Sequence, residues 1–275
     1  NNKNNYTFIE GNICSIDLIR FILNNYKIDT IIHFAAQSHV DNSFTNSLQY
    51  TQDNIVGTHT LLEASRKYNK IKRFIHVSTD EVYGESKLDK DEKKKTEYSL
   101  LYPTNPYAAT KAGAEMLALS YMHSYNLPII ITRGNNVYGP RQYPEKLIPK
   151  FIKYLNEDKK LTIHGDGKNK RSFLYIDDVT EAFLTILEKG KINEIYNIGS
   201  ENENEYSVIE ISKILIKIMK NTDNFVKYLT YVKDRDFNDK RYYISNIKLK
   251  ELGWNQKIGF EDGLIQTIEW YKSRK

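Results

Sequence analysis

The pair of residues with the clearest potential for chemistry is Tyr107 and Lys111, four positions apart. On a helix such a pair shares one face, where the lysine cation lowers the pKa of a tyrosine and makes the phenol a usable base. The same spacing occurs four times in this tyrosine- and lysine-rich chain, so spacing alone decides nothing. Only this pair falls in the first turns of an expected capped helix whose face carries small residues, namely Ala108, Ala109, Ala112 and Gly113. We predict a catalytic pair; an interface tyrosine beside a surface lysine is the alternative.

Two adjacent carboxyl groups form the second feature. Asp80 and Glu81 follow Thr79, directly after a strand-like segment at residues 73–78. Ligands of parallel α/β sheets bind outside the carboxyl ends of the strands. Neighbouring carboxyl groups push each other's pKa values apart, so that one can stay protonated as an acid while the other is a base. The turn therefore predicts an acid–base site, and an exposed acidic turn is the alternative.

A third cluster spans residues 33–41 and again follows a strand-like segment. Ala35 and Ala36 leave room for the backbone of a cofactor, and His39 is a candidate donor to a phosphate or hydroxyl group. A structural role for His39 is equally compatible with the sequence. The other histidines lack the spacing of metal ligands, so we expect no metal site.

Beyond residue 140, cations occur in segments that resemble loops. They are Lys146, Arg171, Arg235 and Arg241. Guanidinium groups bind diphosphates through paired hydrogen bonds. Each cation alone is compatible with solvated surface charge, whereas the group together indicates an anionic ligand.

The elements that must position these residues alternate between strand and helix. We expect a charged loop at 87–97, strands at 6–10, 30–35, 73–78, 128–133 and 195–198, and helices at 15–26, 53–68, 106–125, 208–219 and 260–271. Near-continuous apolar strands separated by helices favour a doubly wound, parallel α/β sheet. After residue 140, proline, glycine and irregular stretches predict a smaller, loop-rich α/β region for a substrate.

Composition limits the remaining function classes. The 275 residues carry 40 Lys and Arg against 35 Asp and Glu, interleaved along the chain, which disfavours a nucleic-acid binder. No apolar run reaches the roughly 18 residues of a membrane span, so we expect no membrane association. Cys14 is the single cysteine, which excludes an intramolecular disulfide framework within this sequence. A cytoplasmic location is the expectation.

Several motifs together resemble one family. They include HFAAQSHVDNS, NIVGTHTLLEA, STDEVYG, NPYAATKAGAE, NNVYGP, YPEKLIPKFI, GDGKNKRSFLYIDDV and DRDFNDKRY, in family order. The sequence is similar to nucleotide-sugar 4,6-dehydratases of the extended short-chain dehydrogenase/reductase superfamily. The resemblance implies a Rossmann-type NAD-binding domain at residues 1–139 and about 174–200. It also implies a nucleotide-sugar-binding region at 140–173 and 201–275.

The resemblance also implies roles for individual residues. Tyr107 would take the 4-hydroxyl proton, Lys111 would hold the cofactor ribose, and Thr79 would bind the 4-hydroxyl. Glu81 would remove the C5 proton, and Asp80 would protonate the departing 6-hydroxyl. Further implied NAD contacts are Asn12, Ile13, Ala35, Ala36 and Val137. Implied substrate contacts are His39, Asn136, Lys146, Leu147, Arg171, Asn202 and Arg241.

The family resemblance leads to one favoured function and two alternatives. We expect a lyase that converts UDP-glucose to UDP-4-keto-6-deoxyglucose, toward UDP-rhamnose-type sugars. A dTDP-glucose 4,6-dehydratase is the alternative, and a non-catalytic nucleotide-sugar-binding homologue is less favoured. The family commonly forms homodimers, here through helices at 53–68 and 106–125.

Two departures from the family pattern stand out. Asn12 replaces a usual aspartate that contacts the adenine. The family pattern also has a glycine-rich turn, which binds the cofactor pyrophosphate at a helix N-terminus. This turn does not occur in the sequence, and the family segment that contains it corresponds to roughly 40–50 residues before Asn1. The expectation is that the 275-residue chain by itself binds NAD poorly.

Overall fold

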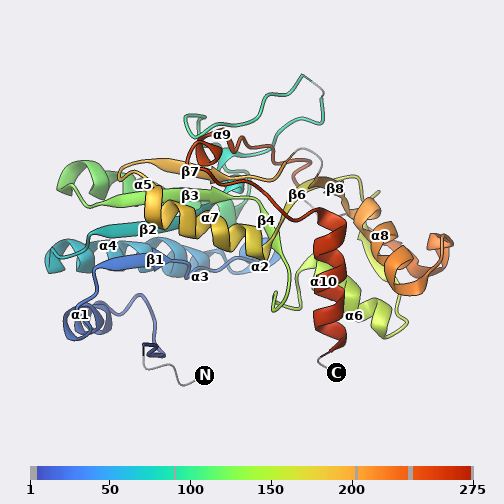
Figure 1. Cartoon of the computed structure of the whole chain (residues 1–275), viewed down its shortest axis with the longest axis horizontal. Coiled ribbons are helices and arrows are strands. Elements are labelled where there is room, and N and C mark those ends of the chain that lie inside the picture. The colour runs from blue at the N-terminus through green and yellow to red at the C-terminus, as the bar shows by residue number, and fades with distance from the viewer. Residues whose placement is uncertain (1–4, 90, 202–203, 235–237, 274–275) are drawn as a thin grey trace. The chain divides into compact units, whose positions relative to one another are not determined.

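The computed structural model describes residues 5–89, 91–201, 204–234 and 238–273 (Figure 1). Contacts divide the chain into two compact units. The first unit comprises Asn1–Ser78, Asn105–Ile131 and Ile192–Glu194. The second comprises Thr79–Thr104, Thr132–Lys191 and Ile195–Lys275.

The first unit is built on parallel strands with helices between them. Strand β1 (Thr30–His33) pairs in parallel with β2 (Arg73–Thr79), so that His33 and His76 are register partners. The remaining elements are α1 (Ile16–Asn25), α2 (Val40–Thr45), α3 (Ser47–Tyr50), the π-helix η1 (Thr51–Val56), α4 (Gly57–Tyr68) and α5 (Pro106–Tyr125). Helix α4 packs against both α1 and α5.

A four-stranded sheet has the order β1-β2-β3-β7, with β3 at Ile129–Gly134 and β7 at Ile195–Ile198. Strands β2 and β3 are nearly all buried, as expected of strands covered on both faces. The strand-like segments expected at 73–78, 128–133 and 195–198 therefore all form strands, within one residue at each end.

The second unit has a core of its own. Strands β4 (Asn136–Tyr138), β6 (Lys170–Tyr175) and β8 (Glu205–Ser207) form a three-stranded sheet in that order, and β5 (Leu161–His164) pairs in parallel with β9 (Leu229–Val232). The other elements are η2 (Asp80–Tyr83), α6 (Leu147–Asn156), α7 (Ile176–Lys189), α8 (Val208–Lys220), η4 (Phe225–Tyr228), α9 (Ile247–Lys250) and α10 (Phe260–Lys272). Helices α6, α8 and α10 pack against one another (Figure 1). Buried aromatic and aliphatic side chains form the core between them.

Two sequence expectations differ from the structure. Residues 6–10 form no strand, since no strand in the described part of the chain pairs with them. The predicted loop-rich region at 140–173 and 201–275 is less loop-rich than expected, because it holds α6. Pro149 lies in the first turn of α6, where its missing N–H breaks no helical hydrogen bond, so this proline does not indicate a loop.

The predicted division into ligand-binding domains stays a prediction. The prediction divides the chain by ligand, with the NAD-binding domain at residues 1–139 and about 174–200 and the nucleotide-sugar-binding region in the rest. The two structural units are defined only by contacts within the chain, so they do not test which ligand each part binds. Separately, none of the helices in the described residues combines the length and apolar character that crossing a bilayer demands.

Helix α5 shows how local sequence fixes the position of Tyr107. The side chain of Asn105 accepts a hydrogen bond from Ala108 N at 2.8 Å, and Pro106 occupies the first helical position. At the other end, Asn126 adopts a left-handed conformation with φ 52° and closes the helix. The helix expected at residues 106–125 therefore has the predicted bounds.

Removal of this cap should be measurable as a loss of stability. Asn105→Ala leaves the Ala108 N–H without its acceptor, and we expect the free energy of unfolding to fall by about 1 kcal/mol. Asn105→Ser keeps an acceptor at the cap and should stay within about 0.5 kcal/mol of the parent. Urea unfolding of the three proteins measures both values. Equal losses in the two variants would show that the side-chain oxygen does not act as the cap.

Candidate active site

The acidic turn begins where β2 ends. Thr79 is the N-cap of η2, because its hydroxyl oxygen accepts a hydrogen bond from Glu81 N at 3.3 Å. Gly84 ends the turn at φ 75°, and a Cβ there would lie 2.2 Å from the carbonyl oxygen of Tyr102. Only glycine fits this conformation and this close approach, so the chain leaves the turn at a fixed point.

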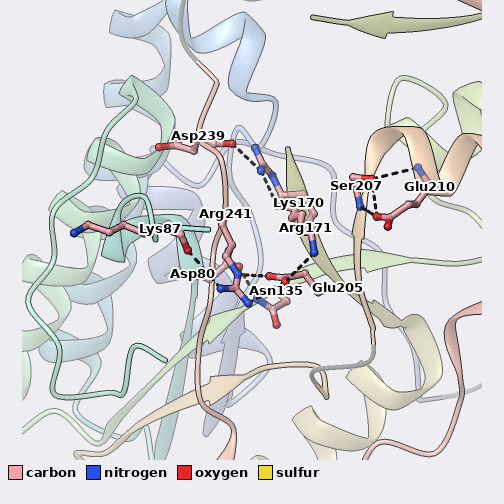
Figure 2. A network of polar contacts seen from close by, with 10 residues as sticks. All are labelled: Asp80, Lys87, Asn135, Lys170, Arg171, Glu205, Ser207, Glu210, Asp239 and Arg241. Atoms are coloured by element: carbon pink, nitrogen blue, oxygen red, sulfur yellow. Dashed lines mark hydrogen bonds and ion pairs between the residues drawn. The ribbon is translucent and has the colours of Figure 1, made fainter. Parts of the chain in front are cut away.

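Asp80 is a buried carboxyl group with a defined partner. Its exposed fraction is 3%, and its Oδ2 accepts a hydrogen bond from Asn135 Nδ2 at 2.6 Å (Figure 2). The Asn135 amide is oriented because its Oδ1 accepts from Ser200 N at 2.9 Å. Burial, together with the negative charge of Glu81, raises the pKa of Asp80 to about 7. The carboxyl group is therefore substantially protonated near neutral pH.

Glu81 has a different environment from Asp80. It is half-buried, and its Oε2 lies 3.2 Å from the hydroxyl of Tyr242. The same hydroxyl oxygen of Tyr242 also lies 2.5 Å from Asp239 Oδ2. The two neighbouring carboxyl groups thus face different polar partners, which is the arrangement that separates an acid from a base.

A buried network supports the turn from within the second unit. Arg133 donates to the hydroxyl of Tyr83 at 2.6 Å, and its guanidinium carbon lies 4.6 Å from the centroid of the Tyr83 ring. Tyr83 in turn donates to Asn197 Oδ1 at 2.8 Å, while Asn197 N donates to Glu97 Oε1. Because Tyr83 is the last residue of η2, this network fixes the end of the turn that carries Asp80 and Glu81.

The predicted loop cations of the second unit are held by specific partners. Arg171 Nη1 donates to the carbonyl oxygen of Asp239 at 2.8 Å. Arg241 binds the carboxylate of Glu205 through Nε and Nη2, at 2.5 and 2.9 Å (Figure 2). Its guanidinium carbon lies 3.8 Å from the ring centroid of Tyr243. Both guanidinium groups are thereby positioned, and Glu205 offsets part of the charge available to an anion.

Other predicted residues of this unit lie on regular elements. Asn136 and Val137 belong to β4, where Val137 is the register partner of Leu174. Lys146 is the N-cap residue of α6 and Leu147 its first residue, both half-buried. Asn202 lies outside the described residues.

In the first unit, Tyr107 and Lys111 are both buried near the start of α5. Lys111 Nζ donates to the carbonyl oxygen of Val77 at 2.6 Å. Burial lowers the pKa of Lys111 to about 8, against a smaller opposing effect of Glu115. The lysine is therefore a cation close to its own titration range, and not a solvated surface group as the alternative interpretation required.

Two buried histidines lie among the β1 and β2 residues of this unit. Burial, and secondarily the charge of Lys111, lowers the pKa of His33 to about 3 and lowers that of His76 well below its usual value. Both imidazoles are therefore neutral. His33 Nε2 lies 2.9 Å from Thr58 Oγ1, which itself donates to the carbonyl oxygen of Asn54.

The segment after β1 leaves its small residues at the surface. Ala35 and Ala36 are exposed. The side chain of Asn54 fixes the next residue, because its Oδ1 accepts a hydrogen bond from Gln37 N and its Nδ2 donates to Gln37 O. His39 is half-buried, and its carbonyl oxygen accepts from Tyr50 at 2.5 Å. The alanines are therefore exposed beside a fixed backbone, and a cofactor contact at them stays a prediction.

Asn12 and Ile13 precede α1. Asn12 Oδ1 accepts from Cys14 N at 2.8 Å, so its side chain closes a local turn. Ile13 packs against Gly57, where a Cβ would lie 2.6 Å from Ile13 Cδ1. Among the described residues, no group of three or more His, Cys, Asp or Glu side chains is arranged to hold a metal ion.

Sequence reasoning missed four residues that the structure brings to the acidic turn and its cations. Asn135 lies beside the predicted Asn136, and Tyr242, Asp239 and Glu205 come from distant segments. The only sequence signal for Asn135, Asp239 and Tyr242 was their position inside family-like motifs, and Glu205 had none. Their pairing depends on tertiary contacts, which spacing along the chain does not encode.

Comparison with known proteins defines the class. The family model described as GDP-mannose 4,6 dehydratase matches residues 1–267, and the chain belongs to this family. The chain is 53% identical over 268 residues to the trifunctional UDP-glucose 4,6-dehydratase/UDP-4-keto-6-deoxy-D-glucose 3,5-epimerase/UDP-4-keto-L-rhamnose-reductase of Arabidopsis thaliana. That alignment covers 97% of this chain and 40% of the relative.

A human relative and a bacterial structure extend the comparison. The chain is 48% identical over 274 residues to dTDP-D-glucose 4,6-dehydratase of Homo sapiens, covering 98% of this chain and 76% of the relative. The crystal structure of dTDP-glucose 4,6-dehydratase from Streptomyces venezuelae, with NAD bound, matches with a TM-score of 0.89 at 38% identity. It covers 97% of this chain and 80% of that one.

These matches confirm the predicted family resemblance and the α/β, Rossmann-type fold class. The chain spans about 40% of the length of the plant relatives it matches. The activity, substrate and partners of the whole protein are therefore matters for proposal.

The raised pKa of Asp80 predicts a pH-dependent stability. Its folded value of about 7 lies above 3.8, so the stabilising contribution is complete below pH 3.8 and is lost as pH rises through 7. We expect the parent to lose free energy of unfolding relative to Asp80→Asn between about pH 4 and about pH 7.5. Denaturant unfolding at each pH measures the difference. Asp91→Asn, an exposed carboxyl in the following loop, is the control; a parent-minus-Asp80→Asn difference that stays constant with pH contradicts the assignment.

Proposed function

We propose that the full-length gene product is a UDP-glucose 4,6-dehydratase. The reaction oxidises C4, eliminates water across C5 and C6 and reduces C6, giving UDP-4-keto-6-deoxyglucose, toward UDP-rhamnose-type sugars. The observation that supports this most is the Asp80 carboxyl, which burial keeps partly protonated beside Glu81. Such a pair supplies both the acid and the base that an elimination requires.

In this proposal the elimination belongs to the acidic turn. Glu81 removes the proton from C5, which a ketone at C4 makes acidic, and the electron pair forms the C5–C6 double bond. Asp80 donates its proton to the departing 6-hydroxyl, which leaves as water. Thr79 binds the 4-hydroxyl, and its hydroxyl lies 3.2 Å from Asp80 Oδ1.

Oxidation at C4 is assigned to Tyr107 and Lys111. Tyr107 takes the proton of the 4-hydroxyl. When bound, NAD would supply the group that accepts the hydride from C4 and later returns it to C6. The residues present fit the ribose of this cofactor. The hydrogen bond of Lys111 to Val77 uses one of three ammonium N–H groups, which leaves donors for hydroxyl groups. The exposed Ala35 and Ala36 leave space beside a fixed backbone.

The remaining assignments follow the family pattern. We propose that the cofactor is also contacted by Asn12, Ile13 and Val137. Contacts to the nucleotide diphosphate and base are assigned to His39, Asn136, Lys146, Leu147, Arg171, Asn202 and Arg241. A homodimer through α4 and α5 is part of the proposal, as is a cytoplasmic location.

A dTDP-glucose 4,6-dehydratase is the second candidate, because relatives named for either nucleotide match nearly the whole chain. The higher identity to the plant relative favours UDP-glucose. A non-catalytic homologue is less favoured, since Thr79, Asp80, Glu81, Tyr107 and Lys111 are all present.

The nucleotide preference can be measured directly. We expect the full-length protein with NAD to show a higher kcat/KM for UDP-glucose than for dTDP-glucose. The alkali-induced absorbance of the 4-keto product follows both reactions. Equal turnover of the two substrates, or none with UDP-glucose, would remove the preference, and turnover of dTDP-glucose alone would establish the second candidate.

A substitution at the proposed C5 base separates oxidation from elimination. Glu81→Gln should still oxidise C4 but eliminate at least about a hundredfold more slowly, because the amide cannot take a proton. Reduced cofactor should then accumulate on the enzyme, which its absorbance reports in a single turnover. Glu85→Gln, at an exposed glutamate just beyond the turn, should behave as the parent. Normal turnover by Glu81→Gln would show that another group is the C5 base.

A further inference from the structure

In the second unit, the carboxyl groups of Asp239 and Glu81 both lie beside the hydroxyl of Tyr242. The hydroxyl of Tyr242 lies 2.5 Å from Asp239 Oδ2 and 3.2 Å from Glu81 Oε2. A tyrosine hydroxyl has one proton to donate. It can therefore donate to one carboxylate only, and the contact with the other becomes a hydrogen bond only when that carboxyl group carries a proton of its own.

The geometry directs the Tyr242 proton to Asp239. A separation of 2.5 Å is typical of a hydroxyl that donates to an ionised carboxylate, whereas 3.2 Å is long for such a bond. Asp239 also acts as an acceptor at its other oxygen, because Oδ1 accepts a hydrogen bond from the hydroxyl of Thr104 at 2.8 Å. The lone pairs of the Tyr242 oxygen then face Glu81.

Tyr242 keeps its proton under working conditions. It is buried, and that burial, together with the charges of Glu81 and Asp239, raises its pKa above the usual range. Arg171 opposes this rise, since its guanidinium carbon lies 4.8 Å from the ring centroid. Figure 2 shows Arg171 directed at Asp239, whose backbone oxygen it binds.

We propose that Asp239 and Tyr242 are positioning residues that increase the proton affinity of Glu81. While Glu81 is ionised, its carboxylate and the Tyr242 oxygen face each other without a shared proton. Once Glu81 has taken a proton, its O–H donates to Tyr242, whose own proton remains directed at Asp239. The protonated form of Glu81 therefore gains a hydrogen bond that the ionised form lacks.

In the reaction, this inference rests on the proposed dehydratase function. The C5–H bond breaks, its electron pair forms the C5–C6 double bond, and the proton stays on Glu81 in a hydrogen bond to Tyr242. The C6–O bond breaks and water leaves with the proton of Asp80. Glu81 returns its proton to C5 when C6 is reduced. Tyr107 releases to solvent the proton of the 4-hydroxyl, and Asp80 takes one up from solvent, so Asp239 and Tyr242 begin and end each cycle unchanged.

A direct effect of charge must be separated from this relay. By Coulomb's law the negative charges of Asp239 and the neighbouring Asp80, when ionised, also favour a proton on Glu81, and the positive charge of Arg171 disfavours it. Removing the charge of Asp239 lowers the pKa of Glu81 by either route. Only the route through Tyr242 disappears when the tyrosine hydroxyl is absent.

The experiment is a carbon-13 NMR titration of glutamate carboxyl groups in the full-length protein and its variants. Glu81→Gln identifies the Glu81 signal by its loss. Tyr242→Phe should lower the titration midpoint of Glu81. Asp239→Asn should lower it clearly in the parent but much less in the Tyr242→Phe background. Tyr231→Phe, at an exposed tyrosine on β9, is the control and should leave the midpoint unchanged.

Two outcomes overturn the proposal. One is an unchanged Glu81 midpoint in Tyr242→Phe. The other is an equal effect of Asp239→Asn with and without the tyrosine hydroxyl, which would leave only through-space charge. Tyr242→Phe and Asp239→Asn are close to isosteric replacements, and the signals of the remaining glutamates report whether each variant is folded.

Kinetics supply the second measurement. Tyr242→Phe should slow elimination about tenfold, the effect of one hydrogen bond, while C4 oxidation is retained. The limb of the kcat profile that rises with pH should move to lower pH, as expected for a weaker base. An unmoved limb with parental turnover would contradict the relay. If no variant or parent converts either nucleotide sugar, the proposed function fails, and the NMR titration still decides the relay.

Discussion

The burial of ionisable groups at the ends of parallel strands is the constraint on which the rest of this structure depends. Removing a charge from water is costly unless the group is neutralised or given fixed partners. Asp80 meets this constraint by retaining a proton and accepting from Asn135. Lys111 meets it by a lowered pKa and a hydrogen bond to Val77. The same desolvation that destabilises these groups gives them pKa values near neutrality, where proton transfer is efficient.

Much of the polar architecture of the second unit holds this arrangement in place. Tyr83, Arg133 and Asn197 form a buried network that fixes the end of the turn carrying Asp80 and Glu81. Thr104 and Asp239 place the Tyr242 hydroxyl beside Glu81. Each of these contacts contributes about 1 kcal/mol to stability. Together they hold each carboxyl group in one position with fixed polar partners. The two acids differ because their fixed partners differ.

Part of the fold and of the candidate site could be predicted because the signals are local. Asn105, Pro106 and Asn126 mark both ends of α5, and the apolar runs mark β2 and β3. Helix α6 was missed because the prolines and glycines after residue 140 indicated loops. Pro149 lies in the first turn of α6, where a proline costs no hydrogen bond. The segment at 6–10 was assigned to a strand on its composition, but a strand forms only with a hydrogen-bonded neighbour.

By itself the sequence determined part of the fold, including β2, β3, β7 and α5, together with the spacing of Tyr107 and Lys111 and the adjacency of Asp80 and Glu81. These features depend on periodicity and on nearest neighbours along the chain. Only the tertiary structure decided that Asp80 is buried against Asn135, that Arg241 is paired with Glu205, and that Glu81 shares a tyrosine with Asp239. The physical reason is that desolvation and hydrogen-bond geometry depend on distance in space, and the residues involved lie up to 161 positions apart in the chain.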